Sequence, residues 1–195
     1  DILRGSACAD ILDGGPDADS VDGNQGIDIA LLGDGDDTFI WDPGDGSDVI
    51  EGQAGTDTML FNGANVAEQV DVSANGDRLT FFRNPGTVTM DTAGVERVDF
   101  KALGGTDLVT VNDLTATDVN ELVLDLAATF GGGTGDGQAD RLVVNATDGN
   151  DAIDVSGDAA EVKVNGLAST IRILHSEAAN DRLEINTLAG TDTVD

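Results

Sequence analysis

The sequence predicts an all-β fold of short stacked strands, with a β-roll over residues 1–62 that continues into a wider β-solenoid over residues 63–195. Three observations lead to this fold class. Aspartates recur at nine-residue intervals in the first third of the chain, and an apolar residue follows each of them at a fixed distance. Glycine is frequent, at 26 of 195 residues, whereas aromatic residues make up only 4%. A longer sequence repeat occupies the rest of the chain.

The aspartate series is regular over residues 1–62. Its steps are 9 residues long, except for one step of 11 residues that contains an insertion at Trp41 and Asp42. An apolar residue lies two positions after each aspartate, and only Ala30 among these is small. An acidic linker has no reason to keep two series in phase, so the pattern indicates a repeated structural unit. The aspartates are Asp1, Asp10, Asp19, Asp28, Asp37, Asp48 and Asp57, and the apolar residues are Leu3, Leu12, Val21, Ala30, Phe39, Ile50 and Met59.

Each unit consists of a six-residue turn and a three-residue strand. Glycine in the turn permits backbone conformations with positive φ, and the apolar residue of the strand points into the core. The turn directs carbonyl oxygens inward and the aspartate adds a carboxylate, and Ca²⁺ prefers ligands of both kinds. The units therefore predict metal sites built from the seven aspartates and from the turn glycines Gly14, Gly23, Gly26, Gly33, Gly35, Gly44, Gly46, Gly52 and Gly55.

Units such as GNQGID (23–28), LGDGDD (32–37) and GQAGTD (52–57) resemble the G-G-x-G-x-D-x-U-x nonapeptide of the RTX, or hemolysin-type, calcium-binding family. The resemblance covers residues 1 to about 62. It implies a parallel β-roll in which two units form one coil and Ca²⁺ lies between stacked turns, with about four to five ions in residues 1–62. One edge would carry Asp1, Asp19, Asp37 and Asp57, and the other Asp10, Asp28 and Asp48.

Four turns depart from the pattern of the family. Cys8 and Asp17 stand at the second glycine position of their units, and Leu32 and Pro43 stand at the first. We expect weak or absent calcium binding at the Cys8 and Asp17 turns. Residues 1–62 also hold 15 acidic residues against the single base Arg4. Stacked like charges are unfavourable without cations between them, so we expect metal binding and folding to be coupled.

The position directly after each aspartate differs between the two predicted sheets. One sheet carries Ile11, Ile29 and Val49 there, and the other carries Ser20, Thr38 and Thr58 after Ile2. If these side chains point outward, the apolar stripe could be covered by a second copy of the chain or by another domain. Ordinary β-propensity at exposed strand positions explains the same residues equally well.

The strict nonapeptides stop after residue 62, and a longer repeat replaces them. Its copies are residues 58–73, 97–112, 141–156 and 182–195, and each contains two alternating strands joined by a polar turn. We expect these copies to stack rung on rung as a right-handed parallel β-solenoid, with a separate β-sandwich as the alternative. The turns at Asp107, Asp151 and Asp192 either bind further Ca²⁺ or only form local hydrogen bonds.

Composition narrows the function. A formal net charge of −29 argues against nucleic acid as a partner, and no segment is long and apolar enough to span a membrane. One cysteine excludes an internal disulfide, and the single histidine, His175, offers no zinc-protease motif. We therefore expect no enzyme activity and no conspicuous sugar-binding row of aromatic residues, for which Trp41, Phe81 and Phe82 are the only candidates.

The resemblance implies a calcium-binding structural or adhesive module whose folding depends on calcium. It also implies a secreted or cell-surface protein of a Gram-negative bacterium, exported unfolded by type I secretion into millimolar Ca²⁺. The alternative is a non-catalytic accessory module of a larger secreted enzyme or of a polysaccharide-acting β-helix protein.

Overall fold

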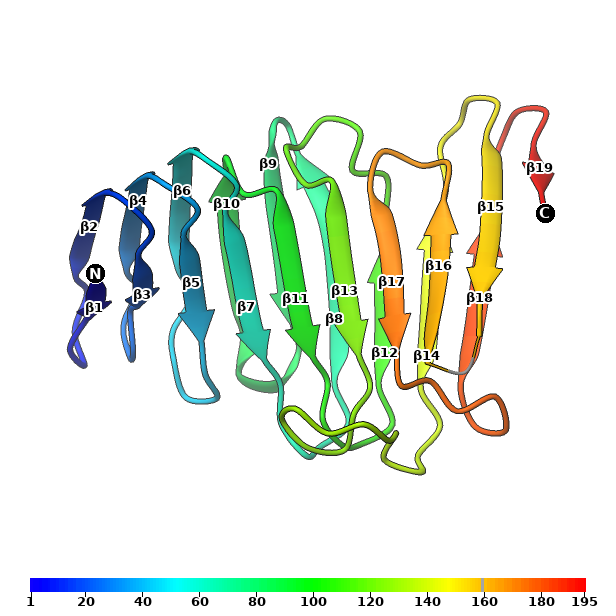
Figure 1. Ribbon diagram of the computed structural model, residues 1–195, viewed down its shortest axis with the longest axis horizontal. Helices are drawn as coiled ribbons and strands as arrows, with labels where there is room; N and C mark the ends of the chain where they lie inside the picture. Colours follow the sequence, from blue (N-terminus) through cyan, green and yellow to red (C-terminus); the bar gives the residue numbers. More distant parts are fainter. Residues whose placement is uncertain (159) are drawn as a thin grey trace.

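The computed structural model describes residues 1–158 and 160–195 and consists mainly of strands. Two sheets face each other along the molecule, and the termini lie at its opposite ends (Figure 1). The ten-stranded sheet contains, in spatial order, β1 (Ile2–Arg4), β3 (Ser20–Asp22), β5 (Thr38–Trp41), β7 (Thr58–Asn62), β11 (Arg97–Lys101), β13 (Glu121–Asp125), β17 (Thr170–Leu174), β16 (Glu161–Asn165), β15 (Ala152–Gly157) and β19 (Thr193–Val194).

The facing nine-stranded sheet is continuous from the first coil to the last. It contains β18 (Arg182–Asn186), β14 (Arg141–Asn145), β12 (Leu108–Val111), β8 (Gln69–Asn75), β9 (Arg78–Arg83), β10 (Val88–Ala93), β6 (Val49–Ala54), β4 (Ile29–Asp34) and β2 (Ile11–Pro16). This all-β, mainly parallel architecture confirms the predicted fold class. A single 3-10 turn, η1 (Pro85–Thr87), is the only helical element of the described residues, and none of their helices could cross a membrane.

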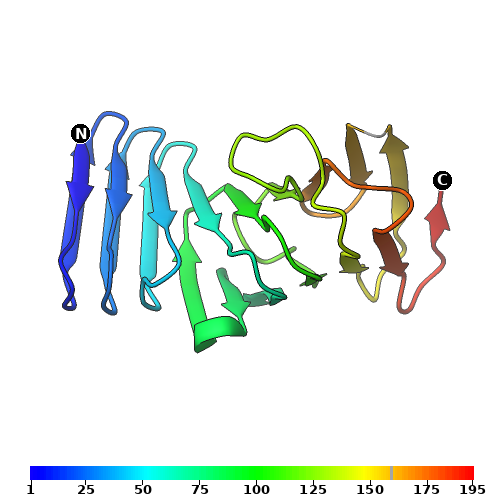
Figure 2. The same cartoon turned by 90° about the horizontal axis from the view of Figure 1, so that it is seen from below.

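Two units form one coil in residues 1–62. In the ten-stranded sheet, Ser20 pairs with Ile2 on one side and with Thr38 on the other, in parallel register. In the nine-stranded sheet, Ile29 pairs in the same way with Ile11 and with Val49. Successive coils of this β-roll lie side by side with the strand–turn–strand path repeated in each (Figure 2).

The predicted apolar positions form the core between the two sheets. Val21, Ala30, Phe39, Ile50 and Met59 are buried, whereas Leu3 and Leu12 of the first coil are partly buried against the same core.

The outward stripe lies where the sequence predicts it. Ile11, Ile29 and Val49 stack in register on the outer face, and Ile11 and Ile29 are 71% and 39% exposed. The other sheet presents Ser20, Thr38 and Thr58.

An aromatic cluster fills the core where the roll widens into the second segment. The Trp41 ring stacks on Phe61 at a centroid distance of 4.0 Å, and Phe61 also contacts Phe81 and Phe100. Trp41 Nε1 donates a hydrogen bond to the carbonyl oxygen of Gly46, at 2.8 Å. Trp41 is therefore a buried core residue and presents no free ring face for a sugar.

The second segment continues the same two sheets, because β7 pairs with both β5 and β11. It is not parallel throughout, however, which corrects the expectation from the repeats. Strands β8, β9 and β10 form an antiparallel meander, as do β15, β16 and β17. Asn75 pairs with Arg78 across a two-residue loop in which Gly76 has a φ of +69°, and such short loops reverse the chain into antiparallel strands.

The stacking of the long repeats is only partly as predicted. The first copy stacks on the second through β7–β11 and β8–β12, and the third on the fourth through β14–β18 and β15–β19. The third copy does not stack on the second in the same phase. Strand β13 supplies the next rung of the ten-stranded sheet, so the third copy starts in the opposite sheet with β14.

Candidate metal sites

Five of the seven predicted aspartates are buried and form hydrogen-bonded ladders along the turn edges. In four of them, Asp28, Asp37, Asp48 and Asp57, Oδ1 accepts the backbone N–H of the aspartate one coil earlier. The N···O distances are 2.6 Å from Asp19 to Asp37, 2.9 Å from Asp37 to Asp57, 2.8 Å from Asp10 to Asp28 and 2.9 Å from Asp28 to Asp48. The two ladders are the two edges that the nine-residue phase predicts.

The other carboxylate oxygen of these side chains is buried without a hydrogen-bond partner among the described residues. A buried polar atom that lacks a partner is costly, and a carboxylate more so than a neutral group. Six such oxygens face the turns: Asp19 Oδ2, Asp28 Oδ2, Asp37 Oδ2, Asp48 Oδ2, Asp57 Oδ2 and Glu68 Oε2.

The first glycine of a turn, five positions before the aspartate, lies against these oxygens. A Cβ atom on Gly23 would lie 2.5 Å from Asp28 Oδ2, and one on Gly52 would lie 2.6 Å from Asp57 Oδ2. The carbonyl oxygen of Gly94, from the neighbouring coil, approaches Gly52 as well. Gly14 is crowded in the same way by Asp19 Oδ2 and by a carbonyl. Carboxylate and carbonyl oxygens therefore gather around positions that have no room for a side chain.

The second glycine of a turn, two positions before the aspartate, lies in close contact with the turn stacked beneath it. A Cβ atom on Gly26, Gly35, Gly46 or Gly55 would clash with the carbonyl group of the turn beneath it. Gly33 meets the Gly15 carbonyl similarly, whereas Gly44 faces open space but has a φ of +119°. Asp17 adopts a φ of +77° although it is not a glycine, which is a strained conformation for an L-residue.

Burial changes the acidity of these carboxyl groups. Loss of solvent, together with the negative charges of Asp28 and Asp45, raises the pKa of Asp48 to about 7. Burial likewise raises the pKa of Asp57 to about 6, with Asp37 and Glu96 adding to the effect. Burial is the largest cause of both shifts, so the ionised carboxylates are unfavourable there unless a positive charge compensates them.

The two aspartates nearest the N-terminus differ from the others. Asp1 is exposed, and its α-amino group lies 2.6 Å from Asp19 Oδ1. Asp10 is half-buried, and its Oδ2 accepts hydrogen bonds from the N–H and the hydroxyl of Ser6. These hydrogen bonds lower the pKa of Asp10.

The ladders extend past residue 62, which the nonapeptide pattern does not show. Glu96 accepts the N–H of Asp57 at 2.7 Å, and so prolongs the first edge. A third ladder, in the second segment, consists of Glu68, Asp107, Asp140 and Asp181, and a fourth joins Asp151 to Asp192.

The sequence contains a signal for Glu68 as a ladder residue. GANVAE (63–68) has a glycine five positions before its acid, and Glu68 follows Asp57 by the same 11-residue step that separates Asp48 from Asp37.

Two carboxyl groups of the third ladder are also less acidic than usual. Burial raises the pKa of Asp107 to about 7 and that of Asp140 to about 6.

In the part of the chain that the structure describes, no three side chains of His, Cys, Asp or Glu come together as a metal-binding group. A cation at a turn would therefore be held by at most two carboxylates and by backbone carbonyls, which suits Ca²⁺ better than zinc.

The single histidine lies in a polar cluster with an aspartate and a lysine. His175 Nδ1 lies 2.7 Å from Asp125 Oδ1, and Lys101 Nζ lies 3.2 Å from Asp125 Oδ2. Burial acts to raise the pKa of Asp125, but the contacts with His175, the Ala127 N–H and Lys101 lower it overall. The cluster joins β11, β13 and β17 on one face of the molecule.

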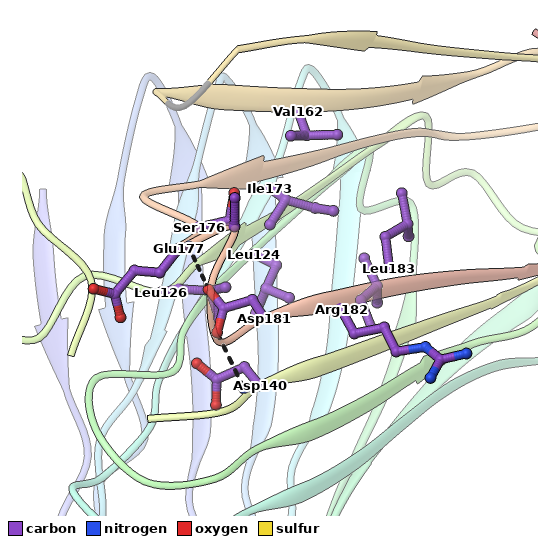
Figure 3. A pocket seen from close by; sticks show the side chains of 12 residues that line it. Leu124, Leu126, Asp140, Val162, Ile173, Ser176, Glu177, Asp181, Arg182 and Leu183 are labelled. Atoms are coloured by element: carbon purple, nitrogen blue, oxygen red, sulfur yellow. Dashed lines mark hydrogen bonds between the residues drawn. The ribbon is translucent and has the colours of Figure 1, made fainter. Parts of the chain in front are cut away.

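A cavity of about 190 Å³ opens between the sheets near the C-terminal coils. Its walls are apolar, and Asp140, Glu177 and Asp181 lie at its rim (Figure 3). The rim acids are tied to each other, because Asp181 accepts the N–H groups of both Asp140 and Glu177.

Fold and edges together define an open two-sheet β-solenoid whose turns are lined with buried carboxylates. No family model and no curated protein matches the chain. Among solved structures, it is similar to the extracellular lipase LipA from Serratia marcescens, with 11% identity over 92% of this chain and a TM-score of 0.23. The chain spans 38% of the length of that lipase chain. A TM-score this low does not establish a shared fold.

Proposed function

We propose that residues 1–62 bind Ca²⁺ at their turn edges and that this binding drives the folding of the β-roll. The observation that carries the proposal is the row of buried carboxylate oxygens without partners. Asp19 Oδ2 and Asp57 Oδ2 lie beside turn glycines that carbonyl oxygens of the neighbouring coil also approach, and Asp28 Oδ2 lies beside Gly23. Ca²⁺ satisfies carboxylate and carbonyl oxygens together, and it does so with flexible geometry.

The charge of the roll supports the same proposal. Fifteen acidic residues and one base fall within residues 1–62, and the coils place the ladder aspartates at strand spacing, about 4.8 Å apart. Repulsion between carboxylates at that distance opposes folding unless cations lie among them. Bound Ca²⁺ would neutralise this charge, so its binding free energy would become folding free energy.

The residues that would hold the ions are the buried aspartates with the turn carbonyls around their glycines. Asp19 and Asp57 have the most complete surroundings, because a turn glycine and a carbonyl of the neighbouring coil lie beside the Oδ2 atom of each. The turn that ends at Asp10 would bind most weakly, because Ser6 already occupies its second carboxylate oxygen.

In this proposal the chain is a structural or adhesive module, without catalysis, of a secreted or cell-surface protein. Low calcium inside the cell would leave the roll unfolded, and millimolar calcium outside would fold it. Affinities near 10⁻⁴–10⁻³ M, usual for extracellular calcium modules, would suffice.

A calcium titration monitored by circular dichroism tests the proposal. The β-sheet signal and the thermal midpoint should rise together with added Ca²⁺, and EGTA should reverse both. Mg²⁺ at the same concentration should do much less, because it demands near-octahedral geometry and sheds its water reluctantly. Identical spectra and thermal midpoints in Ca²⁺ and in EGTA would refute calcium-coupled folding.

A further inference from the structure

The third ladder starts in a different way from the two ladders of the roll. Glu68 donates its N–H to Asp107 Oδ1, as the ladder pattern requires. Among the described residues, no earlier acid donates its own backbone N–H to Glu68. Instead, Glu68 Oε1 binds the guanidinium group of Arg83, through Nε at 2.5 Å and also through Nη2. The third ladder therefore begins with the cationic side chain of Arg83 in the place where the other ladders have an earlier acidic residue.

The inserted hairpin brings Arg83 to this place. Arg83 is the last residue of β9, where it pairs with Val70 of β8 on one side and with Val88 of β10 on the other. Successive side chains of β9 point alternately outward and inward, and those of Leu79, Phe81 and Arg83 share the inward face. An arginine whose side chain points into the core requires an acidic or hydrogen-bonding partner, because an unpaired buried charge is strongly unfavourable.

Groups that stabilise a positive charge surround the Arg83 guanidinium on several sides. Arg83 is 6% exposed and Glu68 is 1% exposed. Arg83 Nη1 donates to the carbonyl oxygen of Pro85 at 2.9 Å, and its Cζ lies 5.3 Å from the centre of the Trp41 ring. A carboxylate, a carbonyl and an aromatic face thus surround one guanidinium group.

The Glu68 turn otherwise keeps the chemistry of the roll turns. Glu68 Oε2 is buried without a partner, like the Oδ2 atoms of the roll aspartates. A Cβ atom on Gly63 would lie 2.5 Å from Glu68 Oε2 and 2.6 Å from the carbonyl oxygen of Lys101. The difference is the charge: the only base within residues 1–62 is Arg4, which is exposed, whereas this turn has Arg83.

We propose that Arg83 occupies a latent divalent-cation site formed by Glu68 and the backbone carbonyls around Gly63. The guanidinium group supplies the positive charge that the roll turns take from calcium, so the Glu68 turn folds without the ion. Removal of the guanidinium charge would convert this turn into a calcium site. The identity of the ion rests on the proposed function, whereas the role of Arg83 as the resident cation does not.

The test compares the full chain with the variants Arg83→Gln, Arg78→Gln and Glu68→Gln/Arg83→Gln. Arg78→Gln is the matched control, because Arg78 binds Glu51 and Asp91 on the outer face, away from the ladder. Calcium stoichiometry is measured by titration calorimetry. Thermal midpoints are measured in EGTA and at a Ca²⁺ concentration about 5-fold above the roughly millimolar dissociation constant of such modules.

Arg83→Gln should bind one more calcium ion than the wild type. Its thermal midpoint in EGTA should fall by about 10 °C, the usual scale for a broken buried ion pair, and Ca²⁺ should recover most of the loss. The double variant, which lacks both charges, should bind no additional ion, and its thermal midpoint in EGTA should lie above that of Arg83→Gln. Arg78→Gln should leave the stoichiometry unchanged.

Two results would overturn the proposal. One is an Arg83→Gln protein whose stability falls without any recovery by calcium, which would make Arg83 an ordinary structural ion pair. The other is an unchanged stoichiometry in Arg83→Gln. If the wild type bound no calcium but Arg83→Gln bound one ion, the proposed function would fail and the latent site would stand.

Discussion

A change from aspartate to asparagine separates the charge of a ladder side chain from its hydrogen bond. The Oδ1 atom of Asp28 or Asp37 accepts a backbone N–H, and an asparagine oxygen can accept the same bond. Asp28→Asn and Asp37→Asn should therefore keep the fold in saturating Ca²⁺ but raise the calcium midpoint of folding about tenfold, or about 1.4 kcal/mol for each lost charge. Circular dichroism during a calcium titration measures this midpoint.

Asp34→Asn is the control for these variants. Asp34 is exposed on the same coils and belongs to neither ladder, so its loss removes the same charge without removing a ladder carboxylate. Equal midpoint shifts in all three variants would mean that calcium responds to the overall charge of the roll and not to the ladder.

The close contact between turns gives a second prediction for single residues. A Cβ atom on Gly46 would clash with the carbonyl group of Gly26 in the turn beneath. Gly46→Ala should lower the free energy of unfolding by about 2 kcal/mol in saturating Ca²⁺, as crowding in a packed site does. Chemical denaturation measures the loss. Gly133→Ala is its control, because that Cβ would meet nothing within 4 Å, and a similar loss there would count against the steric explanation.

At the scale of the strands, the aromatic cluster joins the roll to the second segment. Phe61 of β7 contacts Trp41 of β5, Phe81 of β9 and Phe100 of β11, so four strands of the two sheets meet at one ring. Phe61→Ala should cost about 3–5 kcal/mol of unfolding free energy, the range for a large buried ring. Denaturation in Ca²⁺, followed by Trp41 fluorescence and by circular dichroism, measures the loss.

Phe130→Ala provides the comparison for this prediction. Phe130 is an exposed ring, so its removal should change the unfolding free energy by less than about 0.5 kcal/mol. A comparable loss in both variants would show that the cluster does not hold the two segments together.

For the whole molecule, the balance of charge differs between the two segments. All eight bases of residues 63–195 lie within 4.0 Å of a carboxylate, and a chain of ion pairs crosses the ten-stranded sheet on its outer face. This chain consists of Arg97, Glu121, Arg172, Glu161 and Lys163. Of the 15 acids of the roll, only Glu51 pairs with an arginine or lysine among the described residues, so the stability of the roll should depend on added cations far more than that of the second segment.

The raised pKa values predict how the metal-free protein responds to pH. Burial holds the folded-state pKa of Asp48 and Asp107 at about 7 and that of Asp57 and Asp140 at about 6, above the ordinary aspartate value near 3.9. A raised carboxyl pKa adds stability at low pH, and this stability is lost as pH rises from about 4 to about 7.

In calcium-free buffer, the thermal midpoint should therefore fall between pH 5 and pH 8. Saturating Ca²⁺ should remove or reverse this trend, since the ion binds the ionised carboxylates. Scanning calorimetry at both pH values measures the effect. Asp107→Asn should flatten the calcium-free profile, and a midpoint that is level or rising from pH 5 to pH 8 in the unaltered protein would contradict the assignment.

The sequence by itself determined the repeating unit. The phase of Asp19, Asp28 and Asp37 with their apolar partners predicts the strands, the two edges and the buried core, because a two-unit coil places equivalent residues in register. Short local patterns carry this information, and each coil only repeats them. The alternation of apolar and polar residues in RLTFF (78–82) and TIRIL (170–174) is likewise typical of strands, and these segments form β9 and β17.

Only the tertiary structure decided how the coils beyond residue 62 connect. The antiparallel meanders and the switch of the third copy to the opposite sheet follow from connection lengths and from pairing between distant strands, which local periodicity does not encode. The same holds for the ladder of Glu68 and its contact with Arg83. These two residues lie 15 positions apart in the sequence, and they meet because a hairpin folds a buried arginine back onto the turn edge, where the unpaired carboxylate requires a positive charge.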